Sequence, residues 1–401
     1  MGCSFEFPPS GLRANFSLAT AYIIGLAISM DERTEACTTS IITSIKERGM
    51  IRIIRCVNDA TKLRDFLTII TSLKETHMIL AQPRDASGIK GVETISLDLS
   101  KLKRVCFNSN VFAKMTRLRL LKVHSNSYVS HTHEDIQKKY YDDVIKDASK
   151  IQFNLDFEFL SYEIRYLYWN GYPLDFLLSN FNGENLVELH LKCNNIKQLW
   201  QGNKYLESLK VIDLSCSKKL IQMSEFLSMP NFERLILGGC ASMIDIHPSV
   251  GVLKKLTTLN LTWCDKLMGL PSSINNLESL EILDLSFCSK FKKFPEKERN
   301  MKSLKALRLM KTAIKDLPNS ITDLESLEIR DVSYYSKCDK FPEKGGNMKS
   351  LKVLQLKNTA IKDLLDSIRD LESLEILDLS DCSKFEKFSR YREKHETSTQ
   401  T

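Results

Sequence analysis

Cysteine is the most reactive residue type in this sequence, and four cysteines recur at one place in a repeated pattern. Cys240, Cys264 and Cys288 stand 24 residues apart, and Cys382 takes the same place further along. Converging thiolates would bind a metal ion, but the paired C-x-x-C spacings and nearby histidines typical of zinc sites do not accompany them. The alternative is a reduced thiol that turns inward and satisfies loop backbone. We favour this second interpretation, and unpaired thiols favour a reducing compartment.

A second set of potential metal ligands lies between residues 125 and 150. His131, His133, Glu134 and Asp135 stand together in a polar, charged stretch. Because we find no apolar period there, we expect an exposed loop. Nothing in such a loop would fix the geometry of a metal site, so the sequence predicts no metal.

The sequence lacks the common signatures of catalytic and nucleotide-binding sites. The sequence contains no G-x-S-x-G, H-E-x-x-H or G-x-G-x-x-G string and no P-loop. We therefore predict no catalytic residues, no cofactor and no enzymatic activity. The net charge of +7 comes from 57 basic and 50 acidic residues that are mixed along the chain. This mixture indicates a solvated surface rather than a nucleic-acid-binding one.

The elements that must position these side chains form a repeat. Residues 301–329 read MKSLKALRLMKTAIKDLPNSITDLESLEI, and residues 348–376 read MKSLKVLQLKNTAIKDLLDSIRDLESLEI. Within this long unit lies a finer period of 23 or 24 residues, visible at Leu280, Leu304, Leu327 and Leu351. A fixed period of this size is typical of a solenoid.

Each unit carries the pattern L-x-x-L-x-L-x-x-C/T, whose alternating core predicts a short strand with one buried face. A helical turn is expected on the outer side, as at Ser320 to Leu327. No unit can bury its leucines alone, but stacked units share a core. We predict an α/β leucine-rich repeat solenoid, a horseshoe with parallel strands on its concave face. Its twelve strands are expected to begin near Val92, Leu118, Ile164, Leu186, Leu209, Phe232, Leu256, Leu280, Leu304, Leu327, Leu351 and Leu374.

Three regions are expected along the chain. The repeat array covers residues 86–388, and residues 389–401 form a polar tail that leaves the array without an evident cap. Residues 1–85 do not repeat and are not assigned to a domain, and the apolar spacing over 38–80 predicts a segment that is mainly helical or partly disordered. The apolar run from Phe16 to Met30 is short for a membrane span. It fits either a buried helix or a weak signal peptide, and we favour the helix.

The repeat also predicts a binding surface. The leucines point inward, and the intervening residues face the concave side, where aromatic and arginine side chains often dominate binding. An alternative is that these residues simply coat a sheet, since aromatics favour strands. The candidate partner-binding residues are Tyr166, Tyr168, His190, Lys192, Asp213, Arg234, Asn260, Trp263, Asp284, Phe287, Arg308, Lys311, Tyr334 and Lys357.

One repeat departs from the pattern. Arg330 stands where the other units have an inward leucine, such as Leu283 or Leu354. Since an unpaired buried charge is very costly, we expect a local slip of the strand or a side chain that reaches outward.

Several stretches resemble the leucine-rich repeat region of plant intracellular immune receptors of the TIR-NBS-LRR class. They include GIKGVETISLDLS (88–100), VFAKMTRLRLLKVHS (111–125), ENLVELHLKCNNIKQLW (184–200) and LKVIDLSCSKKL (209–220). Another runs over 157–181 and contains Ile164-Arg165-Tyr166-Leu167-Tyr168-Trp169, similar to a Leu-Arg-Tyr-Leu-x-Trp signature of that class. The resemblance covers about three quarters of the chain. Residues 1–85 match neither the TIR nor the nucleotide-binding domain of such receptors.

The resemblance implies a protein-interaction module of plant innate immunity in the cytoplasm or nucleus. Its partner would be a pathogen effector, a guarded host protein or a signalling domain, and neither a nucleic acid nor a membrane is expected. One alternative is an extracellular receptor ectodomain delivered by the Phe16–Met30 run, with glycan acceptors at Asn15 and Asn260. Another is a truncated receptor fragment without independent activity.

Overall fold

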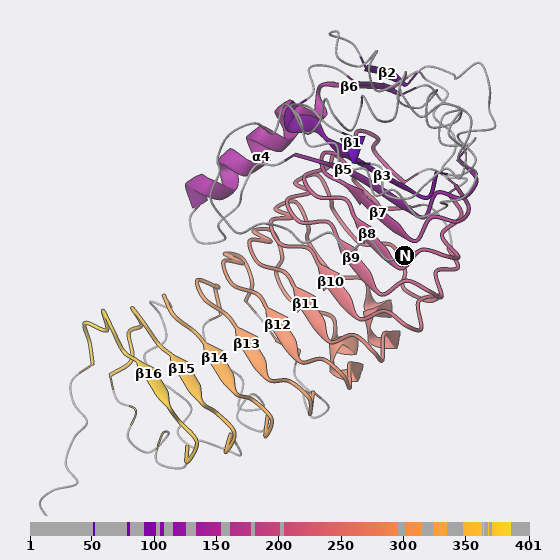
Figure 1. The fold of residues 1–401 in the computed structure, drawn as a ribbon. Coiled ribbons are helices and arrows are strands. Elements are labelled where there is room, and N and C mark those ends of the chain that lie inside the picture. The colour runs from indigo at the N-terminus through magenta and orange to yellow at the C-terminus, as the bar shows by residue number, and fades with distance from the viewer. Residues whose placement is uncertain are drawn as a thin grey trace, which may run out of the picture.

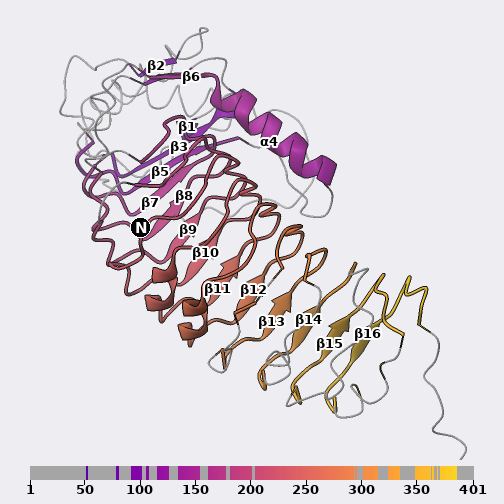
Figure 2. The ribbon, with the colours of Figure 1, turned by 180° about the vertical axis from the view of Figure 1, so that it is seen from behind.

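The computed structural model is a stack of coils, each of which contributes one strand to a long sheet (Figure 1). The strands lie side by side along one face, and the return segments run behind them (Figure 2). Besides strands β1, β2 and β4 and a few isolated residues, the structure describes residues 92–101, 115–125, 134–153, 161–177, 181–200, 204–292, 301–314, 324–334, 348–362 and 371–385.

The main sheet has 13 strands among the described residues. β1 (Ile51–Arg52) pairs antiparallel with β3 at one edge. The others are parallel and follow the order of the chain, which confirms the predicted solenoid and the position of each expected strand. They are β3 (Thr94–Asp98), β5 (Leu120–His124), β7 (Tyr166–Trp169), β8 (Glu188–His190), β9 (Val211–Asp213), β10 (Arg234–Ile236), β11 (Thr258–Asn260), β12 (Ile282–Asp284), β13 (Ala306–Arg308), β14 (Ile329–Asp331), β15 (Val353–Gln355) and β16 (Ile376–Asp378).

The core is a set of aligned leucine columns. Leu259 pairs in register with Leu283, and Leu283 with Leu307, and all three are at most 1% exposed. Because the side chains of neighbouring coils meet at the same depth, each coil completes the burial of the next. Full burial of one leucine contributes roughly 1.5–3 kcal/mol. The shared core therefore explains how such short strands remain ordered.

The outer side is made of short 3₁₀ segments and irregular backbone. η3 (Pro248–Val252) and η4 (Ser272–Asn276) occupy equivalent places in consecutive coils and bury Val250 and Ile274. η2 (Leu99–Lys101) follows β3 directly. These segments agree with the predicted outer turns, although residues 315–323, which include the start of the predicted turn at Ser320 to Leu327, lie outside the described part.

The expected loop between residues 125 and 150 is wrong, because the structure has helix α4 (Glu134–Ala148) there. Tyr141, Val144 and Ala148 recur at helical spacing, and Val144 is buried at 1% exposure. The surrounding charges concealed this short apolar stripe. Figures 1 and 2 both show α4 along the side of the solenoid, next to the early coils.

A second, small parallel sheet was not predicted. It contains β2 (Met78–Leu80), β4 (Val105–Phe107) and β6 (Ile151–Phe153), in the order β2–β4–β6. β1 and β2 are the described parts of the segment 1–85, and both are strands. The rest of that segment, including the Phe16–Met30 run, and the tail 389–401 lie outside the described residues.

Arg330 contradicts both expectations for its coil. β14 pairs in register with both neighbours, Arg330 lying between Leu307 and Leu354, so no slip occurs. The side chain is fully buried rather than directed outward, and its Nη1 lies 3.6 Å from Met348 Sδ. A slip of one residue would turn every side chain of the strand to the opposite face, and the two flanking strands prevent it.

Within the part of the chain that the structure describes, no helix combines the length and apolar character needed for a membrane span.

Candidate functional site

The concave face is formed by the strand residues on either side of the buried leucines. Tyr166 and Tyr168 flank Leu167 on β7 in this way, and each is half-buried. Six further candidates lie on the next strands of the same face, namely His190, Asp213, Arg234, Asn260, Asp284 and Arg308. The parallel register places Tyr168, His190 and Asp213 on adjacent strands as direct neighbours.

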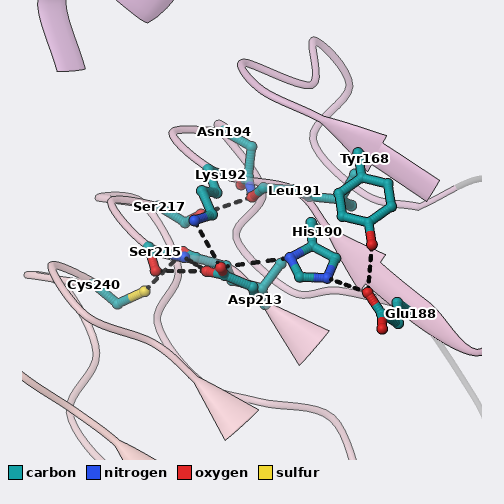
Figure 3. A network of polar contacts seen from close by, with 11 residues as sticks. Tyr168, Glu188, His190, Leu191, Lys192, Asn194, Asp213, Ser215, Ser217 and Cys240 are labelled. Atoms are coloured by element: carbon teal, nitrogen blue, oxygen red, sulfur yellow. Dashed lines mark hydrogen bonds and ion pairs between the residues drawn. The ribbon is translucent and has the colours of Figure 1, made fainter. Parts of the chain in front are cut away.

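These three residues belong to a continuous polar network (Figure 3). The Tyr168 hydroxyl donates to Glu188 Oε2, and His190 Nε2 lies 3.0 Å from the same oxygen. On its other side, His190 Nδ1 lies 3.5 Å from Asp213 Oδ2. Lys192 Nζ approaches that oxygen at 2.9 Å. The Tyr168 and His190 rings also stack, with centroids 4.3 Å apart.

The contacts in this network determine which of its side chains are ionised. Burial by itself would raise the pKa values of Glu188 and Asp213, but their hydrogen bonds outweigh it. Tyr168 and His190 thereby lower the pKa of Glu188, while His190 and Lys192 hold the pKa of Asp213 well below its usual range. Burial and the bond to Glu188 raise the pKa of Tyr168. This part of the face therefore presents ionised carboxylates in fixed positions.

Asp213, Asn260 and Asp284 also have a structural role, which the sequence reading did not anticipate. The Oδ1 atom of each accepts the backbone N–H of the residue two positions later, at 3.0 Å in all three cases. This Asx-type bond stabilises the turn after the strand. Asn260 is thus engaged in the turn, although its sequence matches a glycan acceptor. Arg308 Nη1 lies 3.6 Å from Asp284 Oδ2.

The remaining candidates lie in the turns that follow the strands, at the edge of the concave face rather than on it. Lys192 and Lys357 each precede a residue with positive φ. Trp263, Phe287, Lys311 and Tyr334 themselves hold the left-handed conformation, with φ between 55° and 64°. In this conformation the Trp263 N–H donates to Ser286 O of the next coil at 2.9 Å. The turn geometry, which the leucine pattern does not reveal, carries these side chains outward.

The turn residues form a second cluster, the aromatic edge, made of Trp263, Phe287, Lys311 and Tyr334. The Trp263 and Phe287 rings are stacked, with centroids 4.0 Å apart and planes 5° apart. Lys311 Nζ lies 5.3 Å from the Phe287 centroid and 5.8 Å from the Tyr334 centroid. Such distances are within the range of cation–π attraction.

A groove of about 790 Å³ borders the aromatic edge. Trp263, Phe287 and Lys311 line it together with Lys218, Lys266 and Lys290. The sequence reading missed these three lysines, because each follows its turn by two or three residues, beyond the strand pattern. On β8, Glu188 lies two residues before His190 and therefore belongs to the same face of the strand, as the repeat pattern predicts.

The cysteine column has the structural role that we favoured. Cys240, Cys264, Cys288 and Cys382 are free thiols, and their Sγ atoms donate to backbone carbonyls of preceding coils at 3.0–3.4 Å. Burial raises the pKa values of Cys240 and Cys264, which keeps them as thiols.

Among the residues described, no three His, Cys, Asp or Glu side chains are grouped so that they could hold a metal ion. His131 and His133 lie outside the described residues. Glu134 and Asp135 begin helix α4.

Comparisons with known proteins agree with the coiled architecture. A family model described as Leucine Rich Repeat matches residues 185–204. Disease resistance proteins RPV1 and RUN1 of Vitis rotundifolia are 71% and 70% identical over 172 residues, 42% of this chain, but 12% and 13% of their own length. Disease resistance protein RPP2A of Arabidopsis thaliana is 35% identical over 176 residues, 44% of this chain and 12% of the relative. The matched part of the chain thus spans about an eighth of the length of these relatives.

Solved structures of low sequence identity also match. The Toll–Spatzle complex of Drosophila aligns with 74% of this chain and 42% of the matched chain, at 15% identity and a TM-score of 0.45. A TDR receptor aligns with 74% of this chain and 48% of its own, at 17% identity and a TM-score of 0.45.

Proposed function

The leucine-rich repeats of this chain are homologous to those of plant disease resistance proteins of the TIR-NBS-LRR class, and on this premise we propose that the chain is a recognition module of plant immunity. It binds a partner protein inside the cell through the concave face. The partner is a pathogen effector, a guarded host protein or a signalling domain, and the role is binding rather than catalysis.

The polar network on β7, β8 and β9 is the observation that carries this proposal. Tyr168, Glu188, His190 and Asp213 come from three consecutive coils and hold one another in fixed positions. A preorganised surface loses less side-chain entropy on binding than a mobile one. The network exposes parts of Tyr168, Glu188 and Lys192 beside the buried Asp213, a combination that suits a polar protein surface.

A capture experiment in plant tissue tests the proposal. The tagged full chain is expressed with and without pathogen challenge, and captured proteins are compared for the wild type and the double variant Tyr168→Ala/His190→Ala. Tyr205→Ala is the matched control, because Tyr205 is 70% exposed and lies outside the strands. We expect the double variant to lose partners that the control keeps. If every substitution on the concave face leaves capture intact, the concave face is not the binding surface.

A further inference from the structure

The left-handed turn residues form a column along one edge of the solenoid, one residue per coil. Consecutive members stand beside each other, because each turn N–H donates to the turn of the next coil, as Phe287 N does to Met310 O at 2.6 Å. The column consists of Gly171, Cys193, Cys216, Gly239, Trp263, Phe287, Lys311, Tyr334, Asn358 and Asp381.

Neighbouring members of the column are close enough for their rings to stack, but the member Gly239 has no side chain. Trp263 and Phe287, from adjacent coils, stack at 4.0 Å. On the other side of Trp263 the column member is Gly239, so no side chain stands at the corresponding place. The groove lies there, with the small residues Ala241 and Ser242 in its wall. A planar group in this place would continue the stack on the open face of Trp263.

The charge of the groove is basic. Lys266, Lys290 and Lys311 are exposed, and within the described part of the chain they form no ion pair. The lysines at the opposite end of the strands differ, since each contacts a glutamate of a neighbouring coil at 2.8–3.1 Å. These pairs are Lys210–Glu233, Lys254–Glu278, Lys305–Glu281 and Lys352–Glu328. Asp265 is the acidic residue in the groove wall. Among the described residues, these three ammonium groups therefore have no carboxylate within ion-pair distance.

We propose that this groove binds an acidic segment of a partner protein that carries an aromatic side chain. The aromatic ring stacks on Trp263 in the place that Gly239 leaves open, and carboxylates on either side contact Lys266 and Lys290. This assignment rests on the proposed protein-binding function and adds a second contact surface, separate from the polar network on the concave face.

The ring arrangement favours a peptide over a nucleic acid. Single-stranded nucleic acids stack successive bases on separate aromatic side chains. Among the rings that line the groove, Trp263 and Phe287 cover each other and Lys311 faces Phe287, so one ring face is available for one planar group. The lining lysines are exposed at an open edge, unlike the enclosed pockets that bury most of a small ligand.

The test uses the full chain and a short dye-labelled peptide of aspartates and glutamates around a single phenylalanine. Binding is followed by fluorescence anisotropy and by the intrinsic tryptophan signal. That signal reports on this site, because Trp169 and Trp200 are at most 2% exposed while Trp263 is partly exposed. We expect saturable binding that weakens at least about tenfold when the peptide phenylalanine is replaced by alanine.

Variants of the chain locate the contact. Lys266→Glu/Lys290→Glu and Trp263→Leu should each weaken binding at least about tenfold. Lys254→Glu/Lys305→Glu is the matched control, since it reverses the same number of exposed lysines away from the groove. Circular dichroism melting shows whether each variant is folded.

Three results would overturn the proposal. They are equal binding of the alanine peptide, equal loss in the control variant, and tighter binding of a single-stranded oligonucleotide of the same charge. If the peptide fails to bind while the Tyr168→Ala/His190→Ala variant still loses its partners in tissue, the groove assignment fails and the proposed function stands. If the peptide binds as expected but the Tyr168→Ala/His190→Ala variant keeps all its partners in tissue, the concave-face proposal fails and the groove assignment stands.

Discussion

The turn edge of the solenoid is covered in its early coils and open in its later ones. Gly171, Cys193 and Cys216 lie under helix α4, whose Val144 packs with both cysteines. Further along, Trp263 and Phe287 occupy the same turn position without such a cover. Small side chains permit close packing of a helix, and large ones present a surface. The same backbone turn thus has two uses, which are set by the size of the side chain.

The two regions also differ in the polar contacts of their aspartates on the concave face. Asp213 and Asp284 occupy equivalent strand positions, yet their pKa values move in opposite directions. His190 and Lys192 outweigh the burial of Asp213, whereas burial dominates at Asp284, where Arg308 is more distant. The folded structure therefore favours the ionised form of Asp213 and disfavours the ionised form of Asp284.

Removal of the helix from the covered edge should give the largest effect. Val144→Asp would place a carboxylate where Val144 is 1% exposed, and we expect a loss of roughly 3–5 kcal/mol from the docked state. Cys193 and Cys216 should then react with a thiol reagent much faster. Asp142→Ala, an exposed change on the same helix, is the control. Unchanged thiol reactivity would show that α4 does not protect this edge.

Substitutions that change the size of a turn residue test the difference between the covered edge and the open edge. A Cβ at Gly171 would lie 2.4 Å from Ala148 Cβ, and its φ is 68°. Gly171→Ala should therefore cost roughly 2–4 kcal/mol through overpacking and strain. Trp263→Gly should change stability by only about 1 kcal/mol, because relief of strain offsets the lost ring contact. Chemical denaturation measures both, and equal costs would show that the two edges are equivalent.

Removal of the carboxylate charge separates the two aspartates. Asp213→Asn keeps the turn acceptor, as Asn260 does naturally, and should cost roughly 1–3 kcal/mol at neutral pH. Since the folded pKa of Asp213 is lowered, this contribution is present above the ordinary carboxyl pKa of about 4 and is lost as pH falls through the folded value.

The ionised carboxylate of Asp284 has the opposite effect on stability. Its folded pKa is raised, so its ionised form disfavours folding, and the penalty disappears as pH falls. Asp284→Asn should be neutral or stabilising at neutral pH. Denaturation of both variants across the acidic range gives the measurement. Parallel pH profiles would contradict the assigned difference.

The smallest effect is expected at the helix contact with Lys218. Lys218 Nζ lies 3.6 Å from the Tyr141 ring centroid, and Tyr141→Leu keeps apolar bulk while it removes the ring. We expect a loss of about 0.5–1 kcal/mol. Lys218→Met should not add to it in the double variant, because both changes remove the same interaction. Additive losses would show that the two side chains act separately.

The sequence predicted the elements whose signal repeats. Leu259, Leu283 and Leu307 recur at one spacing, so the strands, their register and the inward thiols followed from the period. Helix α4 was missed because it occurs once, and its apolar stripe is short among many charges. The prediction for Arg330 was wrong because it considered only the cost of burying a charge. It did not consider the two neighbouring strands, which fix the register of β14.

By itself, the sequence determined that the chain forms a stack of coils, because leucines at a fixed spacing can be buried only when successive units stack. Tertiary structure alone decided which surface each intervening residue reaches. The repeat pattern predicted the concave face for both Trp263 and His190, but a left-handed turn carries Trp263 to the edge while the strand holds His190 on that face. It also brought α4 onto the early turns. Burial of leucine depends on local spacing, whereas the contacts of a surface side chain depend on segments distant in sequence.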